Sequence, residues 1–75
     1  MYKFKTKINA IKDVQNFTKA ALRCSGDIDL RQGRYIVNGK SIVGIFSLDL
    51  NSEFTVSLEE ESDKVNFTAF IKEDN

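Results

Sequence analysis

Three features of the sequence have residue types suited to chemistry: a lone cysteine, a run of acidic residues and a serine placed before an apolar segment. The chain contains no histidine, so it lacks an imidazole nucleophile, general base or metal ligand. Its single cysteine, Cys24, excludes an intrachain disulfide and a cysteine metal cluster. Because Cys24 ends an apolar stripe, we expect a buried, inert thiol and not a reactive one.

The acidic run is more typical of a solvated turn that leads into a helix than of a metal site. It comprises Glu59, Glu60, Glu61 and Asp63. Acidic residues are favoured in the first turn of a helix, where the backbone N–H groups lack partners. Because the chain also lacks histidine and has one cysteine, we expect no catalytic residue, no metal site and no cofactor. We expect the protein not to be an enzyme.

Length and composition indicate one small domain, over residues 1–75. The chain has 75 residues and no apolar run near the ~20 residues that cross a bilayer. Its N-terminus alternates in polarity and lacks the apolar core of a signal peptide, which, with the lone cysteine, predicts a cytoplasmic protein. The net charge is zero, which argues against direct binding to nucleic acid or to a membrane.

Hydrophobic periodicity divides the first part of the chain into a strand and a helix. Residues 2–8 alternate between apolar and lysine side chains, which predicts a half-buried strand with a solvated lysine face. Residues 11–23 then follow a helical stripe, which ends at Ser25-Gly26. The stripe consists of Val14, Phe17, Ala20, Ala21 and Cys24.

A hairpin is predicted next, with strands over residues 27–31 and 35–37. Gln32-Gly33 can form the turn, because Gly33 is free to adopt a positive φ. The alternation places Tyr35 on the inner face, where we expect it to pack.

The second half of the chain predicts helix, strand and helix. Ser41 is the natural N-cap of a short helix that begins at Ile42. Residues 53–59 alternate as a strand. Residues 63–72 fit either a strand or a helix, and we predict a helix because Ser62-Asp63 is a good helix start.

The resulting order, β-α-β-β-α-β-α, predicts an α+β fold. A single four-stranded antiparallel sheet with three helices on one face buries every alternating apolar face against a helical stripe. The lysine and glutamate faces are then left in water.

The sequence resembles the HPr family, the histidine-containing phosphocarriers of the bacterial phosphoenolpyruvate-dependent sugar phosphotransferase system. The most specific match is Lys40-Ser41-Ile42-Val43-Gly44-Ile45-Phe46-Ser47-Leu48, which is similar to the family's Lys-Ser-Ile-Met-Gly-Val-Met-Ser-Leu signature. The resemblance implies the family's open-faced β-sandwich, with four strands and three helices, and a shorter final helix here.

The family's phosphocarrier histidine is missing. The resemblance places Ala10 at the histidine, Lys12 at a supporting arginine and Asp13 at a proline. Alanine cannot carry a phosphoryl group, and lysine offers a point charge in place of a bidentate fork. The combination of a lost histidine and a kept serine signature is most similar to the histidine-less catabolite-repression HPr.

By the same resemblance, Ser41 is expected to be phosphorylated by the bifunctional HPr kinase/phosphorylase. The phosphorylated form would then bind a catabolite-control transcription regulator. Ile45, Leu48 and Leu50 fit the inward stripe of the helix after Ser41. Ile42, Val43 and Phe46 are then left as an exposed apolar patch, which is typical of an interface. Lys12 and Lys40 are candidates to assist in holding the phosphate.

Two other interpretations stay open from the sequence. One is a diverged HPr-like domain that binds an unrelated partner and is never phosphorylated. The other is a phosphocarrier whose acceptor is not histidine. A monomer is expected, or a weak homodimer formed by strand exchange at the edge strand of residues 2–8.

Overall fold

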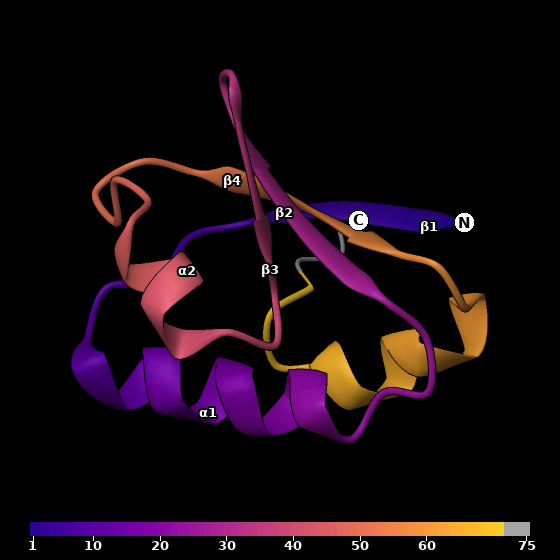
Figure 1. Cartoon of the computed structure of the whole chain (residues 1–75). Helices are drawn as coiled ribbons and strands as arrows, with labels where there is room; N and C mark the ends of the chain where they lie inside the picture. Colours follow the sequence, from indigo (N-terminus) through magenta and orange to yellow (C-terminus); the bar gives the residue numbers. More distant parts are fainter. Residues whose placement is uncertain (72–75) are drawn as a thin grey trace, which may run out of the picture.

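The computed structural model describes residues 1–71 and shows a sheet on one side with helices beneath it (Figure 1). The elements confirm the predicted order. In sequence they are β1 (Tyr2–Thr6), α1 (Ile11–Leu22), β2 (Ile28–Gln32), β3 (Tyr35–Asn38), α2 (Ile42–Phe46), β4 (Phe54–Leu58) and the 3₁₀ helix η1 (Glu61–Phe67).

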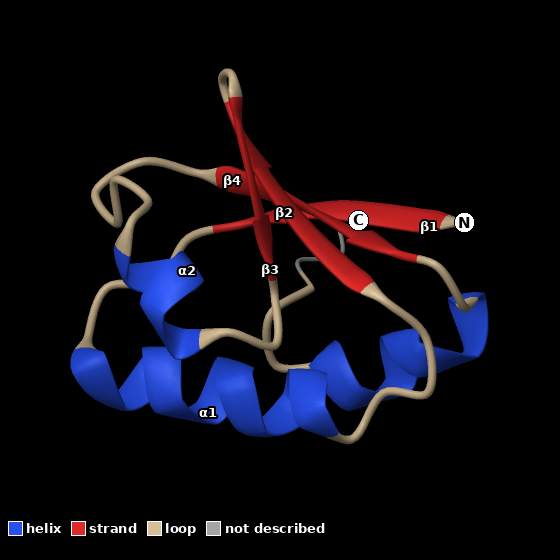
Figure 2. Cartoon of the chain, in the orientation of Figure 1, coloured by secondary structure: helices blue, strands red, loops and turns tan. Residues whose placement is uncertain are grey.

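The four strands form one antiparallel sheet in the spatial order β1-β4-β2-β3. Both helices and η1 lie on the same face of this sheet, so the opposite face is uncovered (Figure 2). The predicted α+β open-faced β-sandwich is therefore confirmed. In the central row of the sheet, Phe4 pairs with Val56 and Val56 with Leu30, and all three side chains are buried.

The helical stripe of α1 is buried as predicted, because every member faces the sheet. Val14, Phe17 and Ala21 have no exposed surface. The ring of Phe17 lies edge-on to Phe54, with centroids 6.0 Å apart, and 5.1 Å from that of Phe67. Phe17 thus joins the helix to both β4 and η1.

The hairpin between β2 and β3 contains one correct prediction and one wrong one. Gly33 adopts φ +59°, the conformation that the turn required. Tyr35, however, is 68% exposed and not packed. It pairs with Gln32 next to the turn of the hairpin. This turn rises away from the helices (Figure 1), so no helix covers the end of the hairpin.

The C-terminal segment forms a helix and not a strand, but its boundaries differ from the prediction. The 3₁₀ helix begins at Glu61, two residues earlier than expected, and ends at Phe67. Lys72, the predicted end, lies outside the described residues. Phe67 is fully buried, so this short helix still supplies a core side chain.

The prediction of a solvated acidic turn is wrong for Asp63, which is buried. Its side chain is 6% exposed, and its carboxylate accepts the backbone N–H groups of Ser25 and Gly26 at 3.1 and 2.9 Å. Glu59, Glu60 and Glu61 are exposed as expected. In residues 1–71, no helix is both long and apolar enough to cross a membrane.

Candidate functional site

The loop that carries Ser41 is fixed against β2 by a glycine. The N–H of Gly39 donates to the carbonyl oxygen of Ile28 at 2.7 Å. A Cβ at position 39 would come within 2.5 Å of Ile28 Cγ2, so no larger residue fits without a shift. The close approach therefore holds the start of α2 at a defined place beside the sheet.

Ser41 is the N-cap of α2, as the sequence predicted. Its backbone is extended, with φ −104° and ψ 116°, and its Oγ accepts the N–H of Gly44 at 3.1 Å. The Ser41 N–H donates in turn to the carbonyl oxygen of Asn38 at 3.1 Å. The hydroxyl thus lies beside the first N–H groups of the helix, which have no partners within it.

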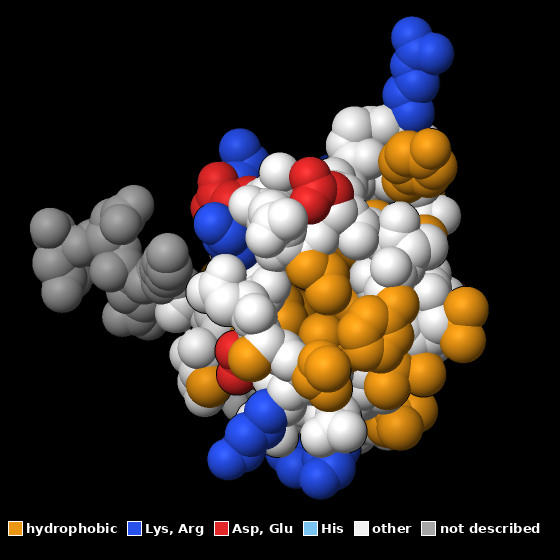
Figure 3. All heavy atoms as spheres, turned by 90° about the vertical axis from the view of Figure 1, so that its left-hand side faces the viewer, with side chains coloured by type: hydrophobic (Ala, Val, Ile, Leu, Met, Phe, Trp, Pro, Cys, Tyr) orange, Lys and Arg blue, Asp and Glu red, His pale blue; other side chains and the backbone are white. Residues whose placement is uncertain are grey.

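Beside this hydroxyl, Ile42, Val43 and Phe46 form an exposed apolar surface, here called the α2 patch. Their side chains are 41%, 77% and 47% exposed, whereas Ile45 is fully buried. Hydrophobic side chains gather on this side of the molecule (Figure 3). The predicted division of α2 into a buried and an exposed side is confirmed for Ile45 and the α2 patch. The helix ends at Phe46, however, so Leu48 and Leu50 lie after it, and Leu48 is buried whereas Leu50 is half-buried. The use of the exposed side for docking stays a prediction.

The two lysines expected near Ser41 have different surroundings. The ammonium of Lys40 donates to the carbonyl oxygen of Cys24 at 3.3 Å, so its side chain is directed to the end of α1. Lys12 is exposed in the first turn of α1, without a hydrogen bond or ion pair to any residue in the described part of the chain. Within residues 1–71, neither lysine forms a hydrogen bond with Ser41.

Ala10, which the resemblance in sequence aligns with a histidine, is the N-cap residue of α1. It has φ −136° and ψ 154°, and its carbonyl oxygen accepts the N–H groups of Asp13 and Val14 at 3.0 and 3.1 Å. Its side chain offers no atom that could accept a phosphoryl group. Asp13 follows in the first turn of α1 and adds a carboxylate there.

Two polar contacts near the site were not anticipated from the sequence. Gln32 Nε2 donates to the carbonyl oxygen of Asp49 at 2.8 Å, and its Oε1 accepts the N–H of Asp49 at 2.7 Å. This pair fastens the segment after α2 to the hairpin. The second contact joins the Asp63 carboxylate to the N–H groups of Gly26 and Ser25. These hydrogen bonds hold the pKa of Asp63 below its usual value. Neither Gln32 nor Asp63 stands in a sequence pattern that distinguishes it from an ordinary polar surface residue, so the sequence does not reveal these contacts.

The thiol of Cys24 matches its predicted inert character. It is 7% exposed and donates to the carbonyl oxygen of Ala20 at 3.4 Å. Burial raises the pKa of the thiol, which disfavours the reactive thiolate at neutral pH.

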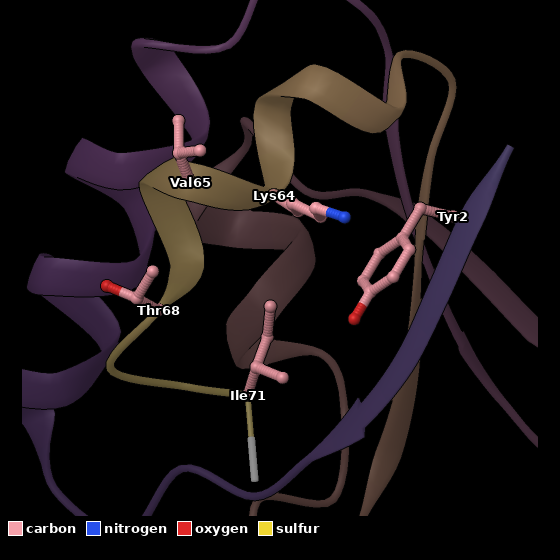
Figure 4. A pocket seen from close by; sticks show the side chains of 5 residues that line it. All are labelled: Tyr2, Lys64, Val65, Thr68 and Ile71. Atoms are coloured by element: carbon pink, nitrogen blue, oxygen red, sulfur yellow. The ribbon is translucent and has the colours of Figure 1, made fainter. Parts of the chain in front are cut away.

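A cavity of about 480 Å³ lies between the start of β1 and the C-terminal segment. Figure 4 shows its lining residues, with the Lys64 side chain directed to the Tyr2 ring. The Lys64 ammonium lies 5.3 Å from the ring centroid and 3.9 Å from a Glu61 carboxylate oxygen. Its charge is therefore already engaged, and among residues 1–71 no other charged side chain lines the cavity.

The fold is an HPr-like open-faced β-sandwich, and the sequence that forms it contains no histidine. A solved structure with the same fold is the crystal structure of HPr-C-His from Thermoanaerobacter tengcongensis. It superposes with a TM-score of 0.77 at 24% sequence identity, over 92% of this chain and 85% of that one. At this identity the likeness establishes the fold alone. No protein-family model and no curated protein matches the sequence.

Proposed function

We propose that the protein is a non-enzymatic regulatory adaptor with an HPr fold, switched by phosphorylation of Ser41. The observation that carries the proposal is the adjacency of a half-buried N-cap hydroxyl and the exposed α2 patch. A phosphate beside a small apolar surface is a docking epitope that a partner can read in two parts, charge and shape.

The reaction would be catalysed by a separate kinase. A bond forms between Ser41 Oγ and the γ-phosphorus of ATP, the bond from that phosphorus to the β–γ bridging oxygen breaks, and ADP leaves. The hydroxyl proton passes to a base of the kinase. The new phosphate adds about −1.5 to −2 charges at pH 7 next to N–H donors that lack helical partners, so the fold can accommodate it.

The proposed partners follow the resemblance to HPr. They are an HPr kinase/phosphorylase, which adds and removes the phosphate, and a catabolite-control transcription regulator, which binds the modified form. The regulator is expected to contact the phosphate with arginine, since a guanidinium makes bidentate bonds to phosphate oxygens. It would also cover Phe46.

Lys40 and Lys12 are given different parts in this proposal. Lys40 is bound to Cys24, so it holds the loop of Ser41 against the end of α1. Lys12 is exposed and carries a charge that a partner can contact directly. In this proposal Lys40 positions the loop that carries Ser41, Lys12 contacts the partner, and neither lysine acts as a phosphoryl acceptor.

The test is phosphorylation by a purified HPr kinase with ATP, followed by intact-mass and fragment analysis. The wild type is expected to gain one phosphoryl group, on Ser41, and Ser41→Ala to gain none. Ser47→Ala is the matched control, because Ser47 lies in the same segment and should leave labelling unchanged. Failure to label folded wild-type protein favours the alternative, a diverged HPr-like domain that uses the α2 patch for an unrelated partner without phosphorylation.

A further inference from the structure

The uncovered face of the sheet carries a row of three polar side chains from three adjacent strands. Lys5 of β1 pairs with Thr55 of β4, and Thr55 pairs with Arg31 of β2. These residues alternate with buried ones (Phe4, Leu30, Val56), so their side chains lie on the face opposite to the helices. Neighbouring strands lie about 4.8 Å apart, which separates Lys5 and Arg31 by roughly 10 Å with Thr55 between them.

A hollow of about 300 Å³ lies over this row. It is lined by Lys5, Arg31 and Thr55 together with Gln32, Gly33, Glu53 and Phe54. Lys5 and Arg31 are exposed, and Thr55, which lies between them, is half-buried. The lining of the hollow therefore includes two cationic side chains and one hydroxyl group.

The charges in this hollow are not neutralised by ion pairs. In residues 1–71, the ion pair within 4.0 Å joins Lys64 to Glu61, and neither Lys5 nor Arg31 has a carboxylate at that distance. Glu53 at the edge of the hollow contributes one negative charge against two positive ones. The lining of the hollow thus carries a net positive charge, and the nearest acidic side chain outside the lining on β2 is Asp29, one row away on the same face.

We propose that this face binds a small phosphate-bearing ligand at Lys5, Thr55 and Arg31. The Arg31 guanidinium would donate two hydrogen bonds to phosphate oxygens, and Lys5 and Thr55 would each donate one. A phosphate dianion placed here relieves the repulsion between the two cations. The size of the hollow favours a small molecule, and the site lies on the other side of the sheet from α2, so it does not depend on Ser41.

The test is a titration of ¹⁵N-labelled protein at constant ionic strength, with inorganic phosphate, with glycerol phosphate and with chloride. Saturable shifts are expected at the amides of Arg31, Gly33 and Thr55 with phosphate, and none with chloride. A larger response to glycerol phosphate identifies a phosphomonoester as the ligand, and an equal response identifies free phosphate.

Variants separate this site from general attraction to lysines. Arg31→Gln and Lys5→Gln should each weaken binding roughly tenfold, the effect of losing a charge-assisted contact. Lys3→Gln, one row away on the same face, should change it less than about twofold. The proposal is overturned if the shifts do not saturate or if Lys3→Gln weakens binding as much as Lys5→Gln. Because all three positions are exposed, thermal unfolding should confirm that each variant remains folded.

Discussion

The carboxylate of Asp63 accepts the backbone N–H of Gly26 at 2.9 Å and so ties η1 to the loop after α1. The same carboxylate accepts the N–H and the hydroxyl of Ser25 at 3.1 and 3.3 Å. One side chain thus satisfies three donors at the end of a helix that has no glycine C-cap. The closure of the C-terminal segment depends on this contact together with the burial of Phe67.

The contact predicts a dependence of stability on pH. Hydrogen bonds from Gly26 and Ser25 lower the pKa of Asp63 in the folded state, so its contribution is present above the ordinary aspartate pKa of about 3.9. The contribution is lost as the pH falls through the lower, folded-state pKa. Asp63→Asn should therefore lower the melting temperature at pH 7, and the gap to wild type should shrink below pH ~4. Thermal unfolding across pH measures both.

The matched control for this experiment is Asp29→Asn. Asp29 is exposed on the outer face of the sheet and makes no side-chain hydrogen bond within residues 1–71. Its removal should leave the melting temperature at pH 7 almost unchanged. An Asp63→Asn variant as stable as Asp29→Asn would show that the contact does not hold the C-terminal segment.

The two sides of α2 give a second prediction. Ile45→Ala should reduce the free energy of unfolding by about 2–5 kcal/mol, because Ile45 is fully buried and truncation leaves a cavity. Against a total of roughly 4–11 kcal/mol for a chain of this length, that loss can unfold the domain. Phe46→Ala should have little effect, since the ring is 47% exposed. Chemical denaturation of both variants decides whether Phe46 is surface or core.

Alternation and helical spacing predicted most of the fold because they report which face of an element is buried. The stripe of α1 and the inward row Phe4, Leu30 and Val56 are examples. The prediction that Tyr35 is packed was wrong for the same reason. Alternation shows on which face of a strand a side chain lies, but not whether another layer covers that face. The tip of the β2–β3 hairpin rises away from the helices (Figure 1), and no local sequence pattern predicts where the cover of the helices ends.

The candidate site was predictable only in part. Ser41 as N-cap and the α2 patch follow from local spacing within a few residues. The contacts of Gln32 with Asp49 and of Asp63 with Gly26 join residues 17 and 37 positions apart. Contacts of this kind depend on how the loops pack after folding, so a sequence pattern does not reveal them.

Restoring the missing histidine gives a third prediction. Wild-type protein incubated with phosphoenolpyruvate and the first enzyme of the phosphotransferase system should take up no acid-labile phosphate, because Ala10 offers no acceptor. Ala10→His should recover little of the activity of a histidine-bearing HPr tested beside it. Lys12 cannot form the bidentate contact of arginine, and the Asp13 carboxylate repels an incoming phosphoryl group. Stoichiometric, acid-labile labelling of the wild type would instead support a phosphocarrier with another acceptor.

The cap at Ser41 gives a fourth prediction. Ser41→Ala should cost about 0.5–2 kcal/mol of stability, because the Gly44 N–H loses its acceptor. Ser41→Asp should keep most of that stability, since aspartate is also a good N-cap. Denaturation of the three proteins measures the cap apart from any phosphorylation. Equal stability of the alanine and aspartate variants would mean that the hydrogen bond to Gly44 contributes little.

Binding to a catabolite-control regulator gives the last prediction, which rests on the proposed phosphorylation. The phosphorylated wild type should bind and the unmodified protein should not, because the phosphate supplies the charged half of the docking epitope. Phosphorylated Phe46→Ala should bind at least tenfold more weakly, as expected for truncation of an aromatic anchor, while keeping its stability. Val65→Ala is the control, because Val65 is 67% exposed but belongs to η1 and not to α2. Calorimetric titration of the four proteins distinguishes the outcomes: full binding by Phe46→Ala removes the α2 patch from the interface, and failure of the phosphorylated wild type to bind favours an unrelated partner.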